Sequence, residues 1–270
     1  MSLHSAINSF MASQAGMRLS ILVQRMANRF GYEIRAAEGG DLPDYYSEIY
    51  EQVRPYTMTS RERLYSMIAA TEHLEASGVK GAIVECGVWR GGSIMAALYA
   101  LARAGKTERE IFLYDTYAGM SAPGQNDGAE EHALFDRFKN EQGLSNWCLA
   151  TLEDVKANVG LCHYPLSKIT FVQGKVEDTI PAQVPAAISL LRLDTDWYES
   201  TLHELIHLYP RLVEGGLLII DDYGKWGGCR RAVDEYFEKH GPRPFLHRVD
   251  PAGRLIIKPP ASQNGSLSPS

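Results

Sequence analysis

The sequence has few cysteines, no excess of positive charge and no long apolar run. Its four cysteines are scattered over 270 residues without CxxC spacing, which argues against a zinc ribbon and against a disulfide scaffold. The net charge is −6, so the chain lacks the electrostatic footprint of a protein that binds bulk nucleic acid. No apolar run reaches the roughly 20 residues that span a bilayer, and residues 17–35 mix arginines into their apolar positions, unlike a signal peptide. These absences predict a soluble, cytoplasmic protein with no nucleic-acid partner and no integral membrane association.

Residues 1–58 are predicted to form a helical N-terminal extension. Segment 17–35 has apolar residues at helical spacing, so it packs on the main domain or on a second subunit of a homo-oligomer, or it lies on a membrane surface. Segment 40–58 is rich in tyrosine and interrupted by two prolines, which predicts an irregular arm that serves as a mobile lid. Ser60 then caps a helix that runs to about Ser77.

From residue 81 the pattern changes to short apolar runs that alternate with helical stretches. The five runs are GAIVECG, EIFLYDT, KITFVQG, AISLLRLDTD and GGLLIIDDY. Such runs are typical of parallel strands buried on both faces of a sheet. The segments PFLHRVD and GRLIIKP then predict a closing antiparallel hairpin. We therefore expect an α/β fold over residues 59–260, a doubly wound, mostly parallel sheet of seven strands, followed by a disordered polar tail at 261–270.

The first apolar run ends in a glycine turn with the pattern E-x-G-x-x-x-G-G-S over residues 85–93. The spacing is not that of G-x-G-x-x-G, and the lysine of a phosphate-binding P-loop is missing. The pattern resembles the first motif of class I S-adenosylmethionine (AdoMet) methyltransferases, although a tight structural turn would also explain it. The resemblance implies cofactor contacts from Glu85, Gly87, Val88, Trp89, Gly91 and Ser93.

The next two apolar runs also end in polar residues. Asp115 ends the second run, where a carboxylate can accept both ribose hydroxyls of a nucleoside or cap a helix. The third run ends at residues 174–178, where a nucleoside-binding sheet contacts the base, although Asp178 could instead cap a helix. The expected contacts here come from Gly174, Lys175, Val176 and Glu177.

Four carboxylates follow the fourth and fifth runs. Asp194 and Asp196 come after LLRL, and Asp221 and Asp222 come after GGLLII. If these strands are neighbours, four negative charges meet at one rim and require a compensating cation. Oxygen ligands alone favour a hard divalent ion such as Mg²⁺ over zinc, while solvated acids on loops are the alternative.

The runs VECGVWRGGS, DTYAGM, LDTDWYEST and GGLLIIDDYGKWGGCRRAVDEYF together resemble the macrocin O-methyltransferase (TylF) family. Its relatives include the mycinamicin and novobiocin sugar O-methyltransferases. The resemblance implies an AdoMet-dependent methyltransferase domain over residues 59–260, with AdoMet at the glycine turn and further cofactor contacts from Thr59 and Ser121. It also implies that Mg²⁺ is held by Asp194, Asp221 and Asp222 and that Asp196 is the general base. The expected acceptor is a hydroxyl of a sugar or glycosylated small molecule.

Other functions remain open at this stage. A catechol-type O-methyltransferase would also use Mg²⁺ and vicinal oxygens, and the tyrosines of segment 40–58 could stack on a sugar or on an aromatic ring. A catalytically inactive binding protein with this fold is a further alternative, although it gives no reason for clustered carboxylates. The run H-E-x-x-H at residues 203–207 matches the zinc-protease signature. Its histidines are expected on the solvent side of their helix, away from the ligand rim.

Overall fold

A computed structural model describes residues 22, 23, 26, 29, 42–141 and 143–260. The chain divides into two units, residues 1–44 and 45–270, and each is considered by itself. In the first unit, the described residues Leu22, Val23, Met26 and Arg29 are helical, which agrees at four positions with the helix predicted over 17–35. The rest of that prediction, and the predicted tail, lie outside the described residues.

The second unit is built around one sheet, whose strand order is β3-β2-β1-β4-β5-β7-β6. Strands β1 to β5 are parallel, β7 is antiparallel to β5, and β6 pairs with β7 as the closing hairpin. Among the described residues the strands are β1 (Ala82–Cys86), β2 (Ile111–Asp115), β3 (Ile169–Gln173), β4 (Ile188–Leu193), β5 (Leu212–Ile220), β6 (His247–Arg248) and β7 (Arg254–Ile257). The predicted doubly wound, mostly parallel seven-stranded sheet is confirmed.

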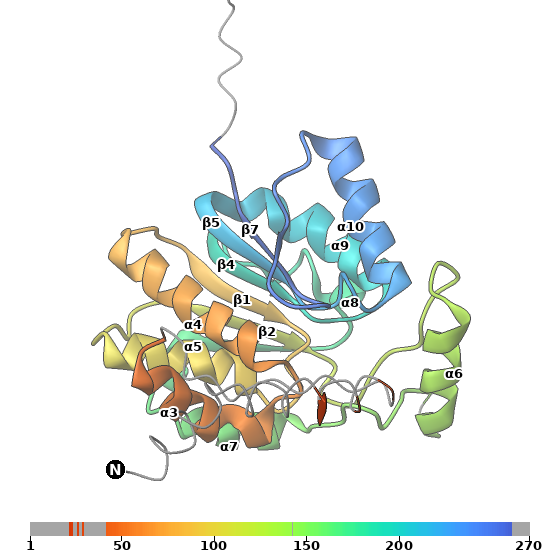
Figure 1. Ribbon diagram of the computed structural model, residues 1–270, viewed down its shortest axis with the longest axis horizontal. Coiled ribbons are helices and arrows are strands. Elements are labelled where there is room, and N and C mark those ends of the chain that lie inside the picture. Colours follow the sequence, from red (N-terminus) through yellow and green to blue (C-terminus); the bar gives the residue numbers. More distant parts are fainter. Residues whose placement is uncertain (1–21, 24–25, 27–28, 30–41, 142, 261–270) are drawn as a thin grey trace, which may run out of the picture. The chain divides into compact units, whose positions relative to one another are not determined.

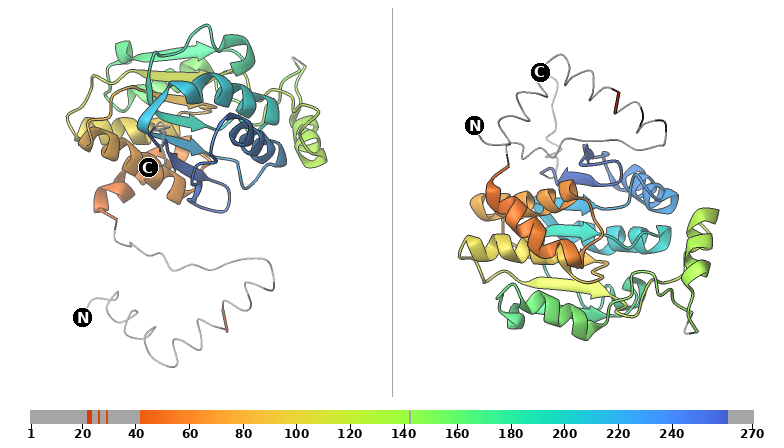
Figure 2. Two further views of the ribbon diagram at one scale, coloured as in Figure 1. Left: turned by 90° about the horizontal axis from the view of Figure 1, so that it is seen from above. Right: turned by 60° about the horizontal axis from the view of Figure 1, so that its bottom comes forward.

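Helices cover both faces of the sheet (Figures 1 and 2). One core cluster joins the sheet to α3 (Asp44–Val53), α4 (Arg61–Ala76), α5 (Gly92–Arg103) and α7 (Leu152–Gly160). A second joins its other face to α8 (Val176–Thr179), α9 (Tyr198–Leu208) and α10 (Gly227–His240). Helix α6 (Ala129–Phe138) belongs to the connection between β2 and α7 and lies on the side toward which β2 points (Figure 2, right). Short 3₁₀ helices occupy Arg54–Tyr56, Leu166–Lys168 and Tyr209–Arg211.

The irregular arm predicted over 40–58 is wrong, because the helix α3 occupies most of it. The two prolines lie outside this helix, at positions 43 and 55. Tyr46, Ile49 and Val53 recur at helical spacing and are buried in the core. Full burial of one such aliphatic side chain contributes about 1.5–3 kcal/mol, so α3 is held to the domain as a packed element.

The helix predicted from Ser60 is confirmed, with the Ser60 hydroxyl accepting a hydrogen bond from the Arg63 amide. Within the described residues, no helix is long and apolar enough to cross a membrane. The sheet order reverses direction between β1 and β4, so the carboxyl ends of these strands form the crevice where α/β sheets bind ligands.

Candidate active site

A cavity of about 1090 Å³, part of it open to solvent, lies at the carboxyl ends of β1, β2, β4 and β5. All the predicted site residues line it except Glu85 and Gly91. Those that line it are Thr59, Gly87, Val88, Trp89, Ser93, Asp115, Ser121, Gly174, Lys175, Val176, Glu177, Asp194, Asp196, Asp221 and Asp222.

The glycine turn between β1 and α5 depends on glycine for two steric reasons. Gly87 has φ +80°, and a Cβ there would collide with the carbonyl oxygen of Asp194 at the end of β4. Gly91 has φ +90° and precedes α5, where it faces the side chain of Val159. Gly91 therefore shapes the turn and packs against α7, while Gly87 lies in the cavity wall.

Asp115 holds the glycine turn in place. One carboxylate oxygen accepts the amides of Val88 and Trp89 at 2.7 and 2.9 Å, and the other accepts the amide of Tyr117 at 2.8 Å. Burial raises the pKa of Asp115, and these amide hydrogen bonds oppose the increase. Because a carboxylate has about four acceptor positions, Asp115 can support the turn and still accept hydrogen bonds from a ligand.

The segment from Tyr56 to Thr59 forms one wall of the cavity. It crosses the start of α5 at Gly92, where a Cβ would lie 2.6 Å from Cβ of Thr57. The other tyrosines of the predicted lid behave differently. Tyr45 and Tyr46 donate hydrogen bonds to Glu72 on α4 and pack against the core. Of the aromatic side chains between residues 45 and 56, Tyr56 is the one that lines the cavity.

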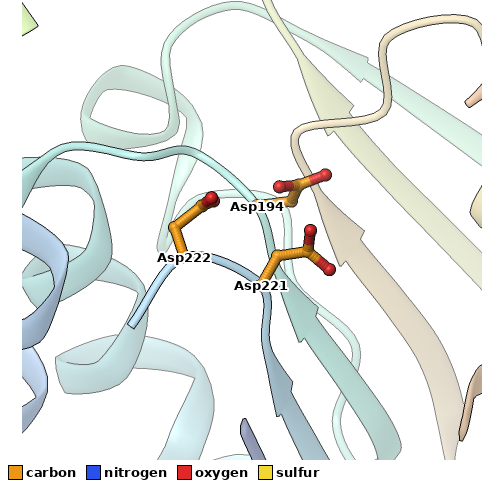
Figure 3. A group of neighbouring side chains, drawn as sticks. All are labelled: Asp194, Asp221 and Asp222. Atoms are coloured by element: carbon orange, nitrogen blue, oxygen red, sulfur yellow. The ribbon is translucent and has the colours of Figure 1, made fainter. Parts of the chain in front are cut away.

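Three carboxylates meet beyond the ends of β4 and β5 (Figure 3). One oxygen from each of Asp194, Asp221 and Asp222 lies within 4.8 Å of the others. Oδ2 of Asp222 is buried and has no hydrogen-bond partner. Burial raises the pKa of Asp222 well above its ordinary value, and the neighbouring carboxylates of Asp196 and Asp221 raise it further. An unpartnered oxygen among oxygen-only donors fits a hard divalent cation.

Two arginines that the sequence analysis missed also contact this cluster. Arg192 on β4 pairs with Asp221 at 2.7 Å, Asp194 at 2.8 Å and Glu85 at 2.6 Å. Arg63 on α4 pairs with Asp221 and, at 2.9 Å, with Asp250 in the C-terminal hairpin. The guanidinium groups therefore compensate part of the negative charge that was attributed to a metal alone.

Glu85 lies beneath the cavity as the buried partner of Arg192. It is fully buried on β1, opposite Arg192 on β4, and one of its oxygens has no hydrogen-bond partner. Burial raises its pKa to about 7, although Arg192 opposes the increase. The structure thus places Glu85 outside the cavity wall, in contact with Arg192 and not with the space available to a cofactor. An arginine within the apolar run ISLLRL was the available sequence signal for this pair.

We expect Arg192→Met to lower the free energy of unfolding by about 3–5 kcal/mol. Removal of one member of a buried ion pair leaves the other as an uncompensated buried charge. Denaturant unfolding measures the loss, with Arg231→Met as the control because Arg231 and Glu235 form an exposed pair. Adding Glu85→Gln to Arg192→Met should recover part of the stability, and equal losses for the two arginine variants would contradict the assignment.

Asp196 occupies the turn after β4 in an uncommon backbone conformation, with φ +66°. Its Oδ1 accepts a 2.9 Å hydrogen bond from the Trp226 indole. Burial raises the pKa of Asp196 to about 7, with a further increase from Asp194, while Asp222, Trp226 and Lys225 oppose it. A carboxylate that titrates near neutrality and lines the cavity is suited to general-base chemistry.

The H-E-x-x-H run does not form a metal site. His203 and His207 are partly buried on α9, and Nε2 of His203 lies 2.9 Å from the carbonyl oxygen of Ile180. Glu204 points inward, is fully buried and accepts the Thr195 hydroxyl at 3.0 Å. Across the part of the chain that the structure describes, Asp194, Asp221 and Asp222 are the one group of three metal-ligating side chains close enough to share an ion.

The sheet order, with its C-terminal hairpin and a glycine turn at the switch point, defines the class I methyltransferase fold. The chain belongs to the macrocin O-methyltransferase (TylF) family, whose sequence model matches residues 17–256, and it is an O-methyltransferase. It is 34% identical over 214 residues to the 8-demethyl-8-(2,3-dimethoxy-alpha-L-rhamnosyl)-tetracenomycin-C 4'-O-methyltransferase of Streptomyces olivaceus, covering 79% of each chain. It is 29% identical to the mycinamicin III 3''-O-methyltransferase of Micromonospora griseorubida, covering 90% of this chain and 97% of the relative. The structure of the O-methyltransferase NovP superposes with a TM-score of 0.68 and 26% identity, covering 91% of this chain and 99% of NovP.

Proposed function

We propose that this enzyme transfers the methyl group of AdoMet to a hydroxyl of a sugar on a glycosylated small molecule, with Mg²⁺ bound at the acidic cluster. The observation that carries the proposal is that one cavity joins the glycine turn to the cluster of Asp194, Asp221 and Asp222. The names of the relatives from Streptomyces olivaceus and Micromonospora griseorubida support a sugar-bearing acceptor.

The cavity has two chemically different ends, which fit the two parts of this reaction. Backbone amides and carbonyls of the glycine turn, Asp115 and residues 174–177 provide a polar end for a nucleoside. The opposite end carries the carboxylates, and the unpartnered oxygen of Asp222 fits a divalent cation there. Asp194, Asp221 and Asp222 would hold the ion.

The residues of the chain divide the work of methyl transfer. AdoMet supplies the methyl group, and a bound divalent ion supplies Lewis acidity that makes a hydroxyl easier to deprotonate. Asp196 accepts the hydroxyl proton at its carboxylate, and the Trp226 indole keeps that side chain oriented. Tyr56, Thr57, Met58 and Thr59 cover the cavity and limit the access of water.

The test combines binding and turnover. Calorimetry should detect AdoMet binding with and without Mg²⁺, and methyl transfer should require both. A panel of glycosides and simple catechols should give methylated sugars. The absence of heat with AdoMet would overturn the methyltransferase assignment for this cavity, and methylation of catechols without sugars would overturn the acceptor class.

Asp115→Ala should raise the dissociation constant of AdoMet about tenfold or more. The change removes a charged acceptor, whose loss costs roughly 1.5–3 kcal/mol, and it also frees the amides of Val88 and Trp89. Gln173→Ala is the matched control, because Gln173 ends the neighbouring strand opposite Asp115 and does not line the cavity. Calorimetric titration measures both, and unchanged affinity in a folded Asp115→Ala protein would remove Asp115 from the cofactor site.

A further inference from the structure

The connection between β2 and α7 contains a segment whose two ends meet at the cavity. We define the α6 insertion as residues 119–141 and 143–148, which include α6. Its ends are joined by backbone hydrogen bonds of 3.1 and 2.9 Å between Met120 and Ser145. Met120 and Ser121 at one end, and Trp147 and Cys148 at the other, line the cavity. The insertion therefore forms a wall of the site that the proposed cofactor contacts leave largely unused.

Carboxylates of the α6 insertion cap the two helices that follow the acidic turns. Helices α9 and α10 begin without a side-chain cap from their own N-cap residues. Oδ1 of Asp127 accepts the amide of Tyr198 at the start of α9 at 2.9 Å. Oε1 of Glu131 accepts the amide of Gly227 at the start of α10 at 3.3 Å. A carboxylate at a helix N-terminus satisfies a free amide and interacts favourably with the helix dipole.

These caps connect the insertion directly to the turn that holds Asp196. Asp127 and Glu131 are buried, and the other oxygen of Asp127 accepts the Gly124 amide at 2.8 Å within the insertion. Since α9 begins at Tyr198, the cap lies two residues beyond Asp196. The Trp197 indole adds a 2.9 Å hydrogen bond to the carbonyl oxygen of Ser121. The position of the wall is therefore tied to the position of the base.

The wall and the turn after β5 together present an aromatic and a cationic group. Trp147 is partly exposed, its ring is 6.3 Å from that of Trp226, and Trp226 is bonded to Asp196. The exposed Nζ of Lys225 lies 4.6 Å from the Trp226 ring and 6.0 Å from the Trp147 ring. Within residues 42–141 and 143–260, Lys225 forms no ion pair with a carboxylate. Its three donors are therefore available to a ligand.

Resting on the proposed function, we propose that the α6 insertion carries the acceptor subsite, in which the sugar ring packs on Trp147 and Lys225 donates to a sugar oxygen. Asp127 is a positioning residue that holds this wall against the catalytic turn. An aromatic ring gives an apolar face for the C–H groups of a pyranose, while an ammonium group satisfies its oxygens. The sugar would then lie beside Asp196, on the cavity wall away from residues 174–177.

Two substitutions test the subsite directly. Trp147→Ala and Lys225→Met should each raise the acceptor KM about tenfold, with the dissociation constant of AdoMet changed less than about twofold. Lys175→Met is the matched control for charge, because Lys175 lines the cofactor end of the same cavity and should leave the acceptor KM unchanged. An unchanged acceptor KM in Trp147→Ala and in Lys225→Met would overturn the subsite.

The positioning role of Asp127 requires a control for lost stability. Thr151→Ala removes the cap of α7, where the Thr151 hydroxyl accepts the Asp154 amide at 3.2 Å outside the cavity lining. We expect Asp127→Ala to raise the acceptor KM and lower kcat, each about tenfold or more, whereas Thr151→Ala should lower Tm without changing either. Asp127→Asn keeps an acceptor oxygen and should recover most of the loss, which also provides a folded variant. Equal kinetics for Asp127→Ala, or Asp127→Asn, and Thr151→Ala would reduce Asp127 to a structural cap.

Failure of this inference is distinguishable from failure of the proposed function. The wild-type enzyme is assayed first for AdoMet binding and for methyl transfer to the glycoside panel. A wild type without sugar methylation overturns the proposed function and the inference with it. A wild type that methylates sugars, with variants of unchanged acceptor KM, overturns the inference alone.

Discussion

Asp196→Asn should lower kcat by about 10²–10⁴-fold, the range for loss of a general base, while binding of AdoMet and of Mg²⁺ stays unchanged. The asparagine side chain keeps an oxygen that can accept the Trp226 indole hydrogen bond, so the turn after β4 should keep its conformation. The proton of the acceptor hydroxyl, however, has no carboxylate to receive it. Raising the pH should restore part of the rate, because hydroxide can replace a base.

The measurement is methyl transfer over a grid of pH and Mg²⁺ concentration, with calorimetry for both ligands. Asp178→Asn is the matched control, because Asp178 is an exposed carboxylate that does not line the cavity. If Asp196→Asn loses Mg²⁺ affinity, Asp196 is a ligand and the base must be another residue.

Asp222→Ala should abolish activity at ordinary Mg²⁺ concentrations, with partial recovery at high Mg²⁺ and little recovery at high pH. Its Oδ2 atom is buried without a partner, so its removal deletes a metal ligand without breaking a printed ion pair. Asp221 differs, because one oxygen bonds to Arg192 and the other to Arg63 and Thr59. Asp221→Ala should therefore lower the free energy of unfolding as well as Mg²⁺ affinity.

Calorimetric titration with Mg²⁺ and denaturant unfolding separate these two effects. The expected pattern is weaker Mg²⁺ binding in both variants and a large stability loss in Asp221→Ala alone. Normal Mg²⁺ affinity in a folded Asp222→Ala protein would remove Asp222 from the ligand set and leave its unpartnered oxygen without a chemical role.

The sheet could be predicted from the sequence because its parallel strands are buried on both faces. Such strands appear as continuous apolar runs, and a polar residue that ends each run marks the carboxyl edge of the sheet. This rule alone brought Asp115, Asp194 and Asp221 to one cavity. It needs no knowledge of which strand pairs with which, and for that reason it works on a single sequence.

Features that depend on register or on distant partners could not be predicted in this way. Glu85 and Arg192 are opposite each other because β1 pairs with β4 in one particular register, and neither strand contains this information by itself. The caps supplied by Asp127 and Glu131 cross from one connection to helices far along the chain. The arm at 40–58 failed for a local reason, since its prolines were taken as breaks although they lie outside α3.

The ion pairs of Arg63 have a consequence for the synthesis of the protein. Arg63 and Asp250 are separated by 187 positions, and both contribute to the environment of Asp221. Chains emerge from the ribosome with the N-terminus first, so Arg63 and the strands β1 to β5 are available before the hairpin that carries Asp250. Until that hairpin has been translated, Arg63 lacks its second carboxylate and can bind Asp221 alone. The cation site therefore reaches its final charge balance only after the last strands have been made, which keeps an incomplete chain from acting as a finished enzyme.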